Sequence, residues 1–283
     1  MELRVIKAEE ITSAVSRLFK ECNYFIGNDI TEALECAYKK EQSPVGKQVI
    51  SQLLENNRIA AEEQIPICQD TGMAVLFVKY GDKVIIEDGS FRNAVESGVR
   101  QAYKEGYLRK SVVNDPVFDR INTKDNTPAI IHTEIVSGSK ISITAGGKGF
   151  GSENMSAIKM LAPSYGKQGV MDFVLETVRK AGPNPCPPIV VGVGIGGTFE
   201  KAAILAKKAT FRPVNTSNPD PRYAEMEKQL LEQINKMGFG PAGLGGNTTA
   251  LGVNIETYPT HIAGMPVAVN ICCHAARHKT VTI

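Results

Sequence analysis

The chain has 283 residues, of which 42% are hydrophobic and 22% charged, and its net charge is +2. This composition is typical of a globular protein, and the length suffices for one large domain or two ordinary ones. The balanced charge excludes the clustered basic footprint of a nucleic-acid-binding protein, and no stretch approaches the roughly 18 apolar residues that span a bilayer. Short basic runs, at Lys207-Lys208 and at Arg277-His278-Lys279, are typical of a solvated surface.

The N-terminus predicts a protein that stays in the cytoplasm. Its first ten residues include acidic side chains and no apolar core of signal-peptide length. Thiols remain reduced in that compartment, so the six cysteines favour metal-binding or catalytic roles over a disulfide framework.

Helices are predicted through the first sixty residues. Apolar side chains recur at helical spacing within residues 11–19 and 30–37, and a further helix is expected from Gly46 onwards. Cys22 and Cys36 fall within these patterns, and we expect both to be small buried thiols.

The next segment of the chain mixes strands, a helix and a loop. A strand is predicted over residues 73–78, a helix over 91–105 and an Asn-, Asp- and Pro-rich loop over 114–128. Strands over 129–136 and 140–144 flank a Ser-Gly-Ser turn, which predicts a β-hairpin.

The second half continues to alternate between helices and strands. A glycine-dense stretch over residues 145–154 is expected to lead into a short helix through Ile158 and Leu161. Further helices are predicted over 166–181, 198–210 and 221–237, and further strands over 189–193, 251–256 and 266–271. Because the alternation lacks a regular strand–helix–strand rhythm, we assign a mixed α/β class without a doubly wound sheet.

The run from Gly192 to Gly197 satisfies the dinucleotide pattern G-x-G-x-x-G after a strand and before a helix. That motif requires a second strand that ends in an acidic residue about 20 residues later. Residues 212–218 instead have the composition of a coil. The sequence therefore argues against NAD binding, and the absence of G-x-x-x-x-G-K-[ST] around Lys148 argues against a P-loop.

Three cysteines lie in turns bounded by Pro or Gly and far apart in the chain. Cys68 stands in Pro-Ile-Cys-Gln-Asp-Thr-Gly, Cys186 in Asn-Pro-Cys-Pro-Pro, and Cys273 in Ile-Cys-Cys-His. Such scattered thiolates cannot form a local zinc finger, which uses paired, closely spaced cysteines. An iron–sulfur cluster with one open iron, a catalytic zinc ion and a cysteine nucleophile all remain open from these residues alone.

Four motifs, in order along the chain, closely resemble class I iron–sulfur fumarate hydratases, specifically the α subunit or N-terminal domain, and the related L-tartrate dehydratase α subunits. They are Pro-Ile-Cys-Gln-Asp-Thr-Gly from Pro66, Gly-Phe-Gly-Ser-Glu-Asn-Met-Ser from Gly149, Cys-Pro-Pro-Ile-Val-Val-Gly-Val-Gly-Ile-Gly-Gly-Thr from Cys186, and Pro-Val-Ala-Val-Asn-Ile-Cys-Cys-His-Ala from Pro266. The resemblance covers essentially the whole chain. It implies a single iron–sulfur hydro-lyase α domain over residues 1–283, with a helical lead over 1–62 and a cluster-bearing α/β body over 63–283.

The resemblance also implies a cofactor and its ligands. A [4Fe–4S] cluster would be held by Cys68, Cys186 and Cys273, and its fourth iron would be open to substrate. Cys273 matches the family's ligand, which precedes His-Ala, whereas Cys272 reads as a small buried residue.

The implied reaction is the reversible conversion of (S)-malate into fumarate and water, a step of the tricarboxylic acid cycle. Gln69, Asp70, Arg109, Gly151 and His261 match substrate-binding positions, and Asp70 matches a proton carrier. The planar guanidinium of an arginine suits carboxylate recognition. L-tartrate and mesaconate are alternative substrates of the same kind, and a non-catalytic iron–sulfur carrier is the alternative from a different class.

A partner subunit follows from the same resemblance. The family's remaining cationic residues and its base lie in the other domain, so we expect a β subunit and an α₂β₂ assembly. The chain alone is expected to be catalytically incomplete.

Overall fold

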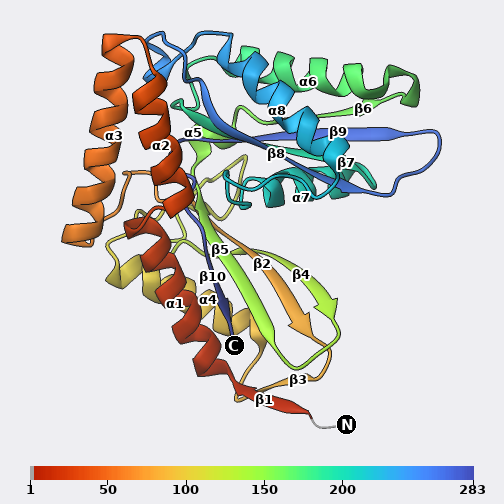
Figure 1. Cartoon of the computed structure of the whole chain (residues 1–283). Coiled ribbons are helices and arrows are strands. Elements are labelled where there is room, and N and C mark those ends of the chain that lie inside the picture. The colour runs from red at the N-terminus through yellow and green to blue at the C-terminus, as the bar shows by residue number, and fades with distance from the viewer. Residues whose placement is uncertain (1–2) are drawn as a thin grey trace. The chain divides into compact units, whose positions relative to one another are not determined.

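The computed structural model describes residues 3–283 and divides the chain into two compact units (Figure 1). Unit 1 comprises Met1–Ile26, Asn57–Gly149 and Arg277–Ile283, and unit 2 comprises Gly27–Asn56 and Phe150–Ala276. Both units combine helices with β-sheets, so the predicted mixed α/β class is confirmed, as is its helical N-terminal segment. The first two residues of the predicted helical lead lie outside the described part of the chain.

Unit 1 is built on a four-stranded sheet in the order β10-β5-β2-β4. The bounds of its elements are β1 (Arg4–Lys7), α1 (Ala8–Tyr24), β2 (Met73–Gly81), β3 (Val84–Glu87), α4 (Phe91–Glu105), β4 (Ile130–Val136), β5 (Ile141–Lys148) and β10 (Lys279–Thr282). The short strands β1 and β3 form a separate parallel pair. The helix α1 packs against α4 and against strands β5 and β10.

An apolar core joins these elements because the inward faces of helices and strands carry large side chains. Val15, Phe19 and Val99 from the helices are fully buried together with Leu76 and Ile143 from the sheet. The periodicity of α1 and α4 explains this arrangement, since residues three and four apart share one helix face.

The predicted hairpin of unit 1 is wrong in its pairing. Both strands exist, but β2 lies between them, pairing in parallel with β4 and antiparallel with β5. The short turn between two strand-like segments predicted local pairing, whereas the sheet places a strand from much earlier in the chain at its centre.

Unit 2 is a three-layer arrangement around the sheet β6-β9-β7-β8. The bounds of its elements are α2 (Asn28–Lys40), α5 (Phe150–Glu153), β6 (Ala157–Leu161), η1 (Pro163–Tyr165), α6 (Gly166–Ala181), β7 (Ile189–Gly196), α7 (Phe199–Ala209), α8 (Pro221–Asn235), η2 (Pro241–Gly243), β8 (Ala250–Tyr258) and β9 (Met265–Cys272). In Figure 1, α6 and α8 lie on one side of this sheet and α7 on the other. The helix α3 (Pro44–Glu63) begins in unit 2 and ends in unit 1.

The central strands of unit 2 are almost entirely buried, because helices cover both faces of the sheet. Strand β7 consists of Ile, Val and Gly and has seven of its eight residues buried. A strand buried on both faces is a continuous apolar run without polar alternation. The segment predicted as a short helix through Ile158 and Leu161 is instead strand β6, which pairs antiparallel with β9.

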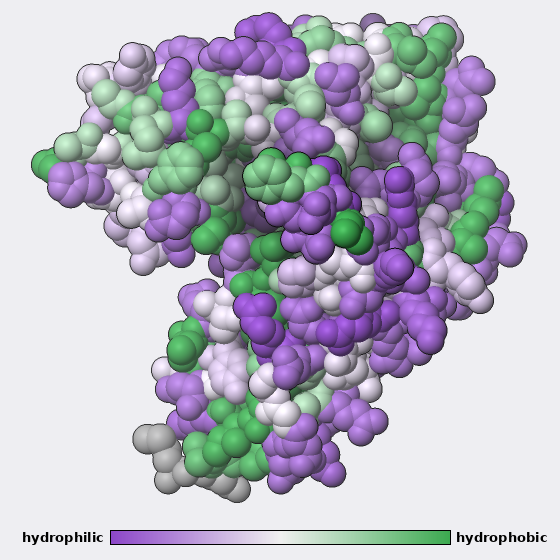
Figure 2. All heavy atoms as spheres, turned by 180° about the vertical axis from the view of Figure 1, so that it is seen from behind, coloured by the Kyte–Doolittle hydropathy of each residue, from purple (hydrophilic) through white to green (hydrophobic). Residues whose placement is uncertain are grey.

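No helix among the described residues is long and apolar enough to cross a membrane. On the face drawn in Figure 2, hydrophobic residues form small separate groups among hydrophilic ones.

Candidate functional site

Cys68, Gln69 and Asp70 lie in unit 1, in the turn between α3 and β2. Cys68 and Asp70 are half-buried and Gln69 is exposed, so all three side chains have access to solvent. The Cys68 thiol donates a hydrogen bond of 3.2 Å to Gln69 Oε1. Asp70 Oδ1 accepts from the Gly72 amide at 3.0 Å and so closes the turn.

Buried polar side chains hold the backbone of this turn in place. The Tyr103 hydroxyl donates to the Thr71 and Gly72 carbonyls at 3.2 and 2.8 Å, and Asn126 Nδ2 donates to the Gly72 carbonyl at 3.2 Å. Arg277 donates from Nη2 to the Asp70 carbonyl and from Nε to the Gly147 carbonyl at 3.3 Å. The turn is therefore a rigid support, which functional side chains require.

Arg277 is the functional-site neighbour that sequence reasoning missed. We expected the run Arg277-His278-Lys279 on the surface, but Arg277 is only 4% exposed. Its carbonyl partners belong to residues far away in the sequence, so no local pattern could have revealed them.

The glycine-containing end of β5 lies directly against the turn. A Cβ atom at Gly72, where φ is +77°, would lie 2.5 Å from the Lys148 backbone, and one at Gly149 would lie 3.1 Å from Asp70 Oδ2. The backbone of Lys148 cannot yield at 2.5 Å, whereas the Asp70 carboxylate would have to shift slightly. The two glycines therefore allow the end of β5 to approach the Asp70 turn closely.

Arg109 follows α4 in unit 1 and is exposed. Its carbonyl accepts a hydrogen bond of 3.1 Å from the Thr71 hydroxyl, which attaches the Arg109 backbone to the Cys68 turn. Within residues 3–283, the Arg109 guanidinium makes no hydrogen bond or ion pair. It is therefore available for an anionic ligand beside that turn.

Cys186 and Cys273 lie in unit 2, at the same end of one sheet. Cys186 precedes β7 and Cys273 follows β9, and these strands run antiparallel with Val190 opposite Cys272. Cys186 is exposed and Cys273 half-buried. Cys272 is 7% exposed, as predicted for a small buried residue.

Gly151 lies at this same end of the sheet, in α5. Ser156, just beyond α5, accepts hydrogen bonds from Asn270 Nδ2 at 3.0 Å and from the Ile271 amide at 3.1 Å. Asn270 also donates to Glu153 Oε2 at 2.9 Å. A Cβ at Gly151 would meet nothing within 4 Å, so no internal packing requires a glycine there.

His261 lies at the opposite end of the sheet from Cys186 and Cys273. Its loop joins β8 to β9 across the far end of β7, where Thr260 Oγ1 donates to the Gly197 carbonyl at 2.9 Å. The eight residues of β7 separate the two ends by about 25 Å. His261 therefore does not share a site with Cys186 and Cys273 within unit 2.

The chemistry of the three candidate cysteines suits an iron–sulfur cluster. Cys68, Cys186 and Cys273 have accessible thiols in turns, which suits thiolate ligation of iron. Burial raises the pKa of the Cys22 thiol to about 11, against a smaller opposing effect of the Arg277 charge, so Cys22 is a poor ligand. Within residues 3–283, no three His, Cys, Asp or Glu side chains form a group that could hold a metal ion.

The position of Cys36 also differs from the prediction. We predicted a buried thiol, but Cys36 is exposed on α2. The buried face of α2 carries Ile30, Leu34 and Ala37. Cys36 lies about 200° from Leu34 around the helix, so it falls outside that face.

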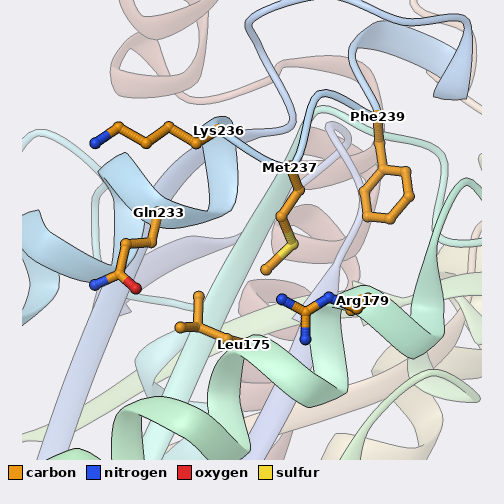
Figure 3. Close-up of a pocket in the computed structure, with 6 residues that line it drawn as sticks. All are labelled: Leu175, Arg179, Gln233, Lys236, Met237 and Phe239. Atoms are coloured by element: carbon orange, nitrogen blue, oxygen red, sulfur yellow. The ribbon is translucent and has the colours of Figure 1, made fainter.

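One distinct pocket of unit 2 has a volume of about 540 Å³ and lies between α6 and α8 (Figure 3). It is lined by Leu175, Arg179, Gln233, Lys236, Met237 and Phe239, and thus by none of the predicted site residues. Arg179 stands in the last turn of α6 and Lys236 at the end of α8. Cations are favoured at helix C-termini, which gives both a structural reason for their positions.

The glycines of the dinucleotide-like run have a packing role. Cβ atoms at Gly192 and Gly194 would lie 2.2 and 2.1 Å from the carbonyls of Ala206 and Ala202, in α7. Residues 212–218 form no helix or strand, as predicted. The run therefore brings α7 close to β7, and nothing else about it indicates a nucleotide.

Comparison with known proteins gives matches along nearly the whole chain. The family model described as "Fumarate hydratase (Fumerase)" matches residues 12–282. A protein of Methanocaldococcus jannaschii, provisionally named L(+)-tartrate dehydratase subunit alpha, is 44% identical over 95% of both chains. The L(+)-tartrate dehydratase subunit alpha of Escherichia coli K12 is 33% identical, over 97% of this chain and 91% of its own. The chain therefore belongs to the class I fumarate hydratase family of iron–sulfur hydro-lyases, among the α subunits.

Proposed function

We propose that the chain is the α subunit of a hydro-lyase that reversibly converts (S)-malate into fumarate and water. The observation that carries this proposal is the turn of Cys68, Gln69 and Asp70, to which Thr71 attaches the Arg109 backbone, so that the unpaired Arg109 guanidinium lies on a segment fixed to the turn. The family match over residues 12–282 supports the type of reaction. Residues 1–283 would then work as one hydro-lyase domain.

The proposed cofactor is a [4Fe–4S] cluster held by Cys68, Cys186 and Cys273. Their accessible thiols support this set over Cys22 and Cys272, which are buried. When bound, such a cluster supplies a Lewis-acidic iron to the substrate oxygens.

The side chains of unit 1 would bind and orient the dicarboxylate. Arg109 would hold a carboxylate through two parallel hydrogen bonds, and Gln69 would donate to a neighbouring oxygen. Asp70 would carry the proton that the substrate hydroxyl gains or loses. Arg277, bound to the Asp70 carbonyl, would keep this carboxyl group in position.

Gly151 would contribute its backbone from unit 2, because no side chain or neighbour covers the place where a Cβ would stand. His261 is also proposed to bind substrate. Since about 25 Å separate it from Cys186 and Cys273 in the same unit, it would do so at a second copy of the chain.

A β subunit is the proposed partner, in an α₂β₂ assembly, and the cytoplasm is the proposed location. The relatives' names carry the designation "subunit alpha", which supports a second kind of chain. The partner would provide the base and the other cations of the site.

L-tartrate is the second candidate substrate, because the relatives are named L(+)-tartrate dehydratase subunits. Malate and tartrate share two carboxylates and one hydroxyl, and tartrate adds a second hydroxyl. A site that hydrogen-bonds a substrate hydroxyl discriminates strongly, whereas an apolar pocket does not. Mesaconate, which adds a methyl group to fumarate, is the third substrate to compare.

The decisive experiment is anaerobic co-expression with the organism's own β-type subunit, followed by assays on malate, fumarate, L-tartrate and mesaconate. We expect the complex to interconvert malate and fumarate with the highest kcat/KM and the chain alone to be inactive. An iron–sulfur carrier would show visible absorbance that malate leaves unchanged, and no turnover. Comparable turnover by the isolated chain would refute the need for a partner.

A further inference from the structure

The loop between α4 and β4 displays large apolar side chains to solvent. Val117 is 68% exposed, Phe118 84% and Ile121 58%, and Tyr107 at the start of the loop is almost fully exposed. Single exposed apolar residues are ordinary, but several on one short segment indicate a binding surface. We call residues 114–121 the apolar loop.

Hydrogen bonds keep the apolar loop ordered although its large apolar side chains are exposed. Asp115 Oδ1 accepts from the amides of Val117 and Phe118, and Asn114 Oδ1 accepts from the Asp115 and Ile121 amides at 2.7 and 3.0 Å. The Asn114 amide donates to the Ile121 carbonyl at 2.9 Å. Hydrogen bonds from the Phe118 and Val117 amides also lower the pKa of the Asp115 carboxyl, so it stays ionised at neutral pH.

The base of the loop is attached to the candidate site of unit 1. The Ser111 amide donates to Asn126 Oδ1 at 2.8 Å, and Asn126 Nδ2 donates to the Gly72 carbonyl of the Cys68 turn. Arg109, which precedes the loop, is bonded to Thr71 of the same turn. Asn122, which follows the loop, donates from Nδ2 to the Lys110 carbonyl at 2.8 Å, so both ends of the loop return to the segment next to Arg109.

We propose that the apolar loop, through Val117, Phe118 and Ile121, is the surface on which this chain binds its β subunit. The inference rests on the proposed function, which requires a partner that completes the substrate site next to Arg109. A pre-ordered loop loses little conformational entropy on binding, and large apolar side chains at its tip suit an interface centre.

The β subunit fits this surface better than a second copy of the chain does. The loop flanks the candidate substrate side chains of unit 1, where residues from a different chain are needed. The β subunit is proposed to supply the base and the remaining cations of the substrate site, whereas a second copy is proposed to supply His261 alone. The surface carries Asp115, Asp119 and Arg120 around its apolar centre, a polar rim of the kind found at heteromeric interfaces.

The test compares Val117→Ser, Phe118→Ser and Ile135→Ser in the full-length chain. Ile135 is 75% exposed on β4 of the same unit and serves as the matched control. Affinity for the purified β subunit is measured by calorimetry, and thermal midpoints and bound iron are recorded for every variant. We expect Val117→Ser and Phe118→Ser to bind at least about tenfold more weakly, with thermal midpoint and iron content unchanged, and Ile135→Ser to bind as the wild type does.

Variants of Asp115 test whether the ordered conformation of the loop contributes to β-subunit binding. Asp115→Ala removes the acceptor for two amides and should weaken β-subunit binding, whereas Asp115→Asn keeps an acceptor oxygen and should restore most of it. Unchanged affinity in Phe118→Ser and Val117→Ser would overturn the assignment of the surface but not the proposed function, provided that the wild-type complex turns over malate.

Two further outcomes would contradict the proposal. If the variants alter self-association of the chain and leave β-subunit binding unchanged, the loop covers a second copy and our assignment is wrong. If the wild-type chain fails to bind the β subunit, the partner and hence the proposed function fail together with the surface.

Discussion

Arg277 contributes to the site through the backbone it holds, not through a contact with substrate. Its buried guanidinium connects the Asp70 carbonyl to the Gly147 carbonyl and so fixes the Cys68 turn against the end of β5. A local charge pattern predicts a surface residue here because nothing near it in sequence reveals a buried carbonyl. The Pro- and Gly-bounded turns and the family motifs singled out Cys68, Cys186 and Cys273 as candidate ligands, whereas nothing in the sequence indicated that Arg277 supports the Cys68 turn.

Replacing Arg277 should therefore destabilise unit 1. Arg277→Ala leaves the two buried carbonyls without their charged donor, and we expect the free energy of unfolding to fall by about 2–3 kcal/mol. Urea unfolding followed by circular dichroism measures this. Arg17→Ala, which removes an exposed guanidinium 4.0 Å from Glu21, is the control and should cost less than about 0.5 kcal/mol. Equal losses in the two variants would contradict the structural role of Arg277.

Elements were easier to predict than their pairing. The bounds of α4 and α6 match the predicted residues 91–105 and 166–181, because amphipathic periodicity over four turns is a strong signal. Strand β6 was mistaken for a helix because Ile158 and Leu161 stand three residues apart, and five residues are too few to distinguish the two periods. The insertion of β2 between β4 and β5 depends on long-range packing that local turn rules ignore.

The contact between α7 and β7 gives a prediction about Gly194. In Gly194→Ala the new Cβ would lie 2.1 Å from the Ala202 carbonyl and 2.5 Å from the Ala206 amide nitrogen, both backbone atoms of α7. The helix would have to shift, and we expect a loss of stability of about 1–3 kcal/mol. Gly264→Ala, where a Cβ meets nothing within 4 Å, is the matched control and should change thermal unfolding little. A Gly194→Ala protein as stable as the wild type would show that α7 is not closely packed.

Glu41 joins the turn after α2 to the glycine-rich loop before β8. Its carboxylate accepts from the amides of Asn247 at 2.9 Å, Thr248 at 3.0 Å and Ser43 at 3.0 Å. Burial raises the pKa of this carboxyl, but the hydrogen bonds from Asn247, Ser43 and Thr248 outweigh burial and leave the pKa below its ordinary value.

Because the folded state lowers the pKa of Glu41, its stabilising effect is present above the unfolded pKa of about 4.3 and is lost as the pH falls through the folded value. Glu41→Gln should lower the free energy of unfolding by about 1–3 kcal/mol at pH 7. The difference from the wild type should shrink below pH 4. Urea unfolding at pH 7 and at pH 3.5 tests this, and a constant difference at both values would exclude ionisation as the cause.

At the scale of the whole molecule, the candidate residues are divided between the two units. Cys68, Gln69, Asp70 and Arg109 belong to unit 1, and Gly151, Cys186, His261 and Cys273 to unit 2. The motifs identified these residues in sequence, but they gave no indication that His261 and Cys186 lie at opposite ends of one sheet.

Mixed assemblies test the proposal that His261 acts on a second copy. His261→Ala and Cys186→Ala should each lower kcat/KM on the order of 100-fold in the complex with the β subunit. If His261 serves a neighbouring copy, co-expressing the two variants should restore about one quarter of the wild-type sites. About half of the randomly formed pairs contain one copy of each variant, and one of the two sites in such a pair has both residues intact. Activity that stays at the level of the single variants would place both residues in the same copy or remove His261 from the site.

The last seven residues, Arg277–Ile283, return to unit 1, where β10 pairs with β5 at the edge of the sheet. During synthesis, unit 1 therefore cannot close until this tail has left the ribosome, although most of its other residues emerged long before. The nascent Cys68 turn lacks its arginine anchor throughout that interval. The ribosome therefore translates nearly all of unit 2 between the synthesis of the turn and the arrival of the arginine that fixes it.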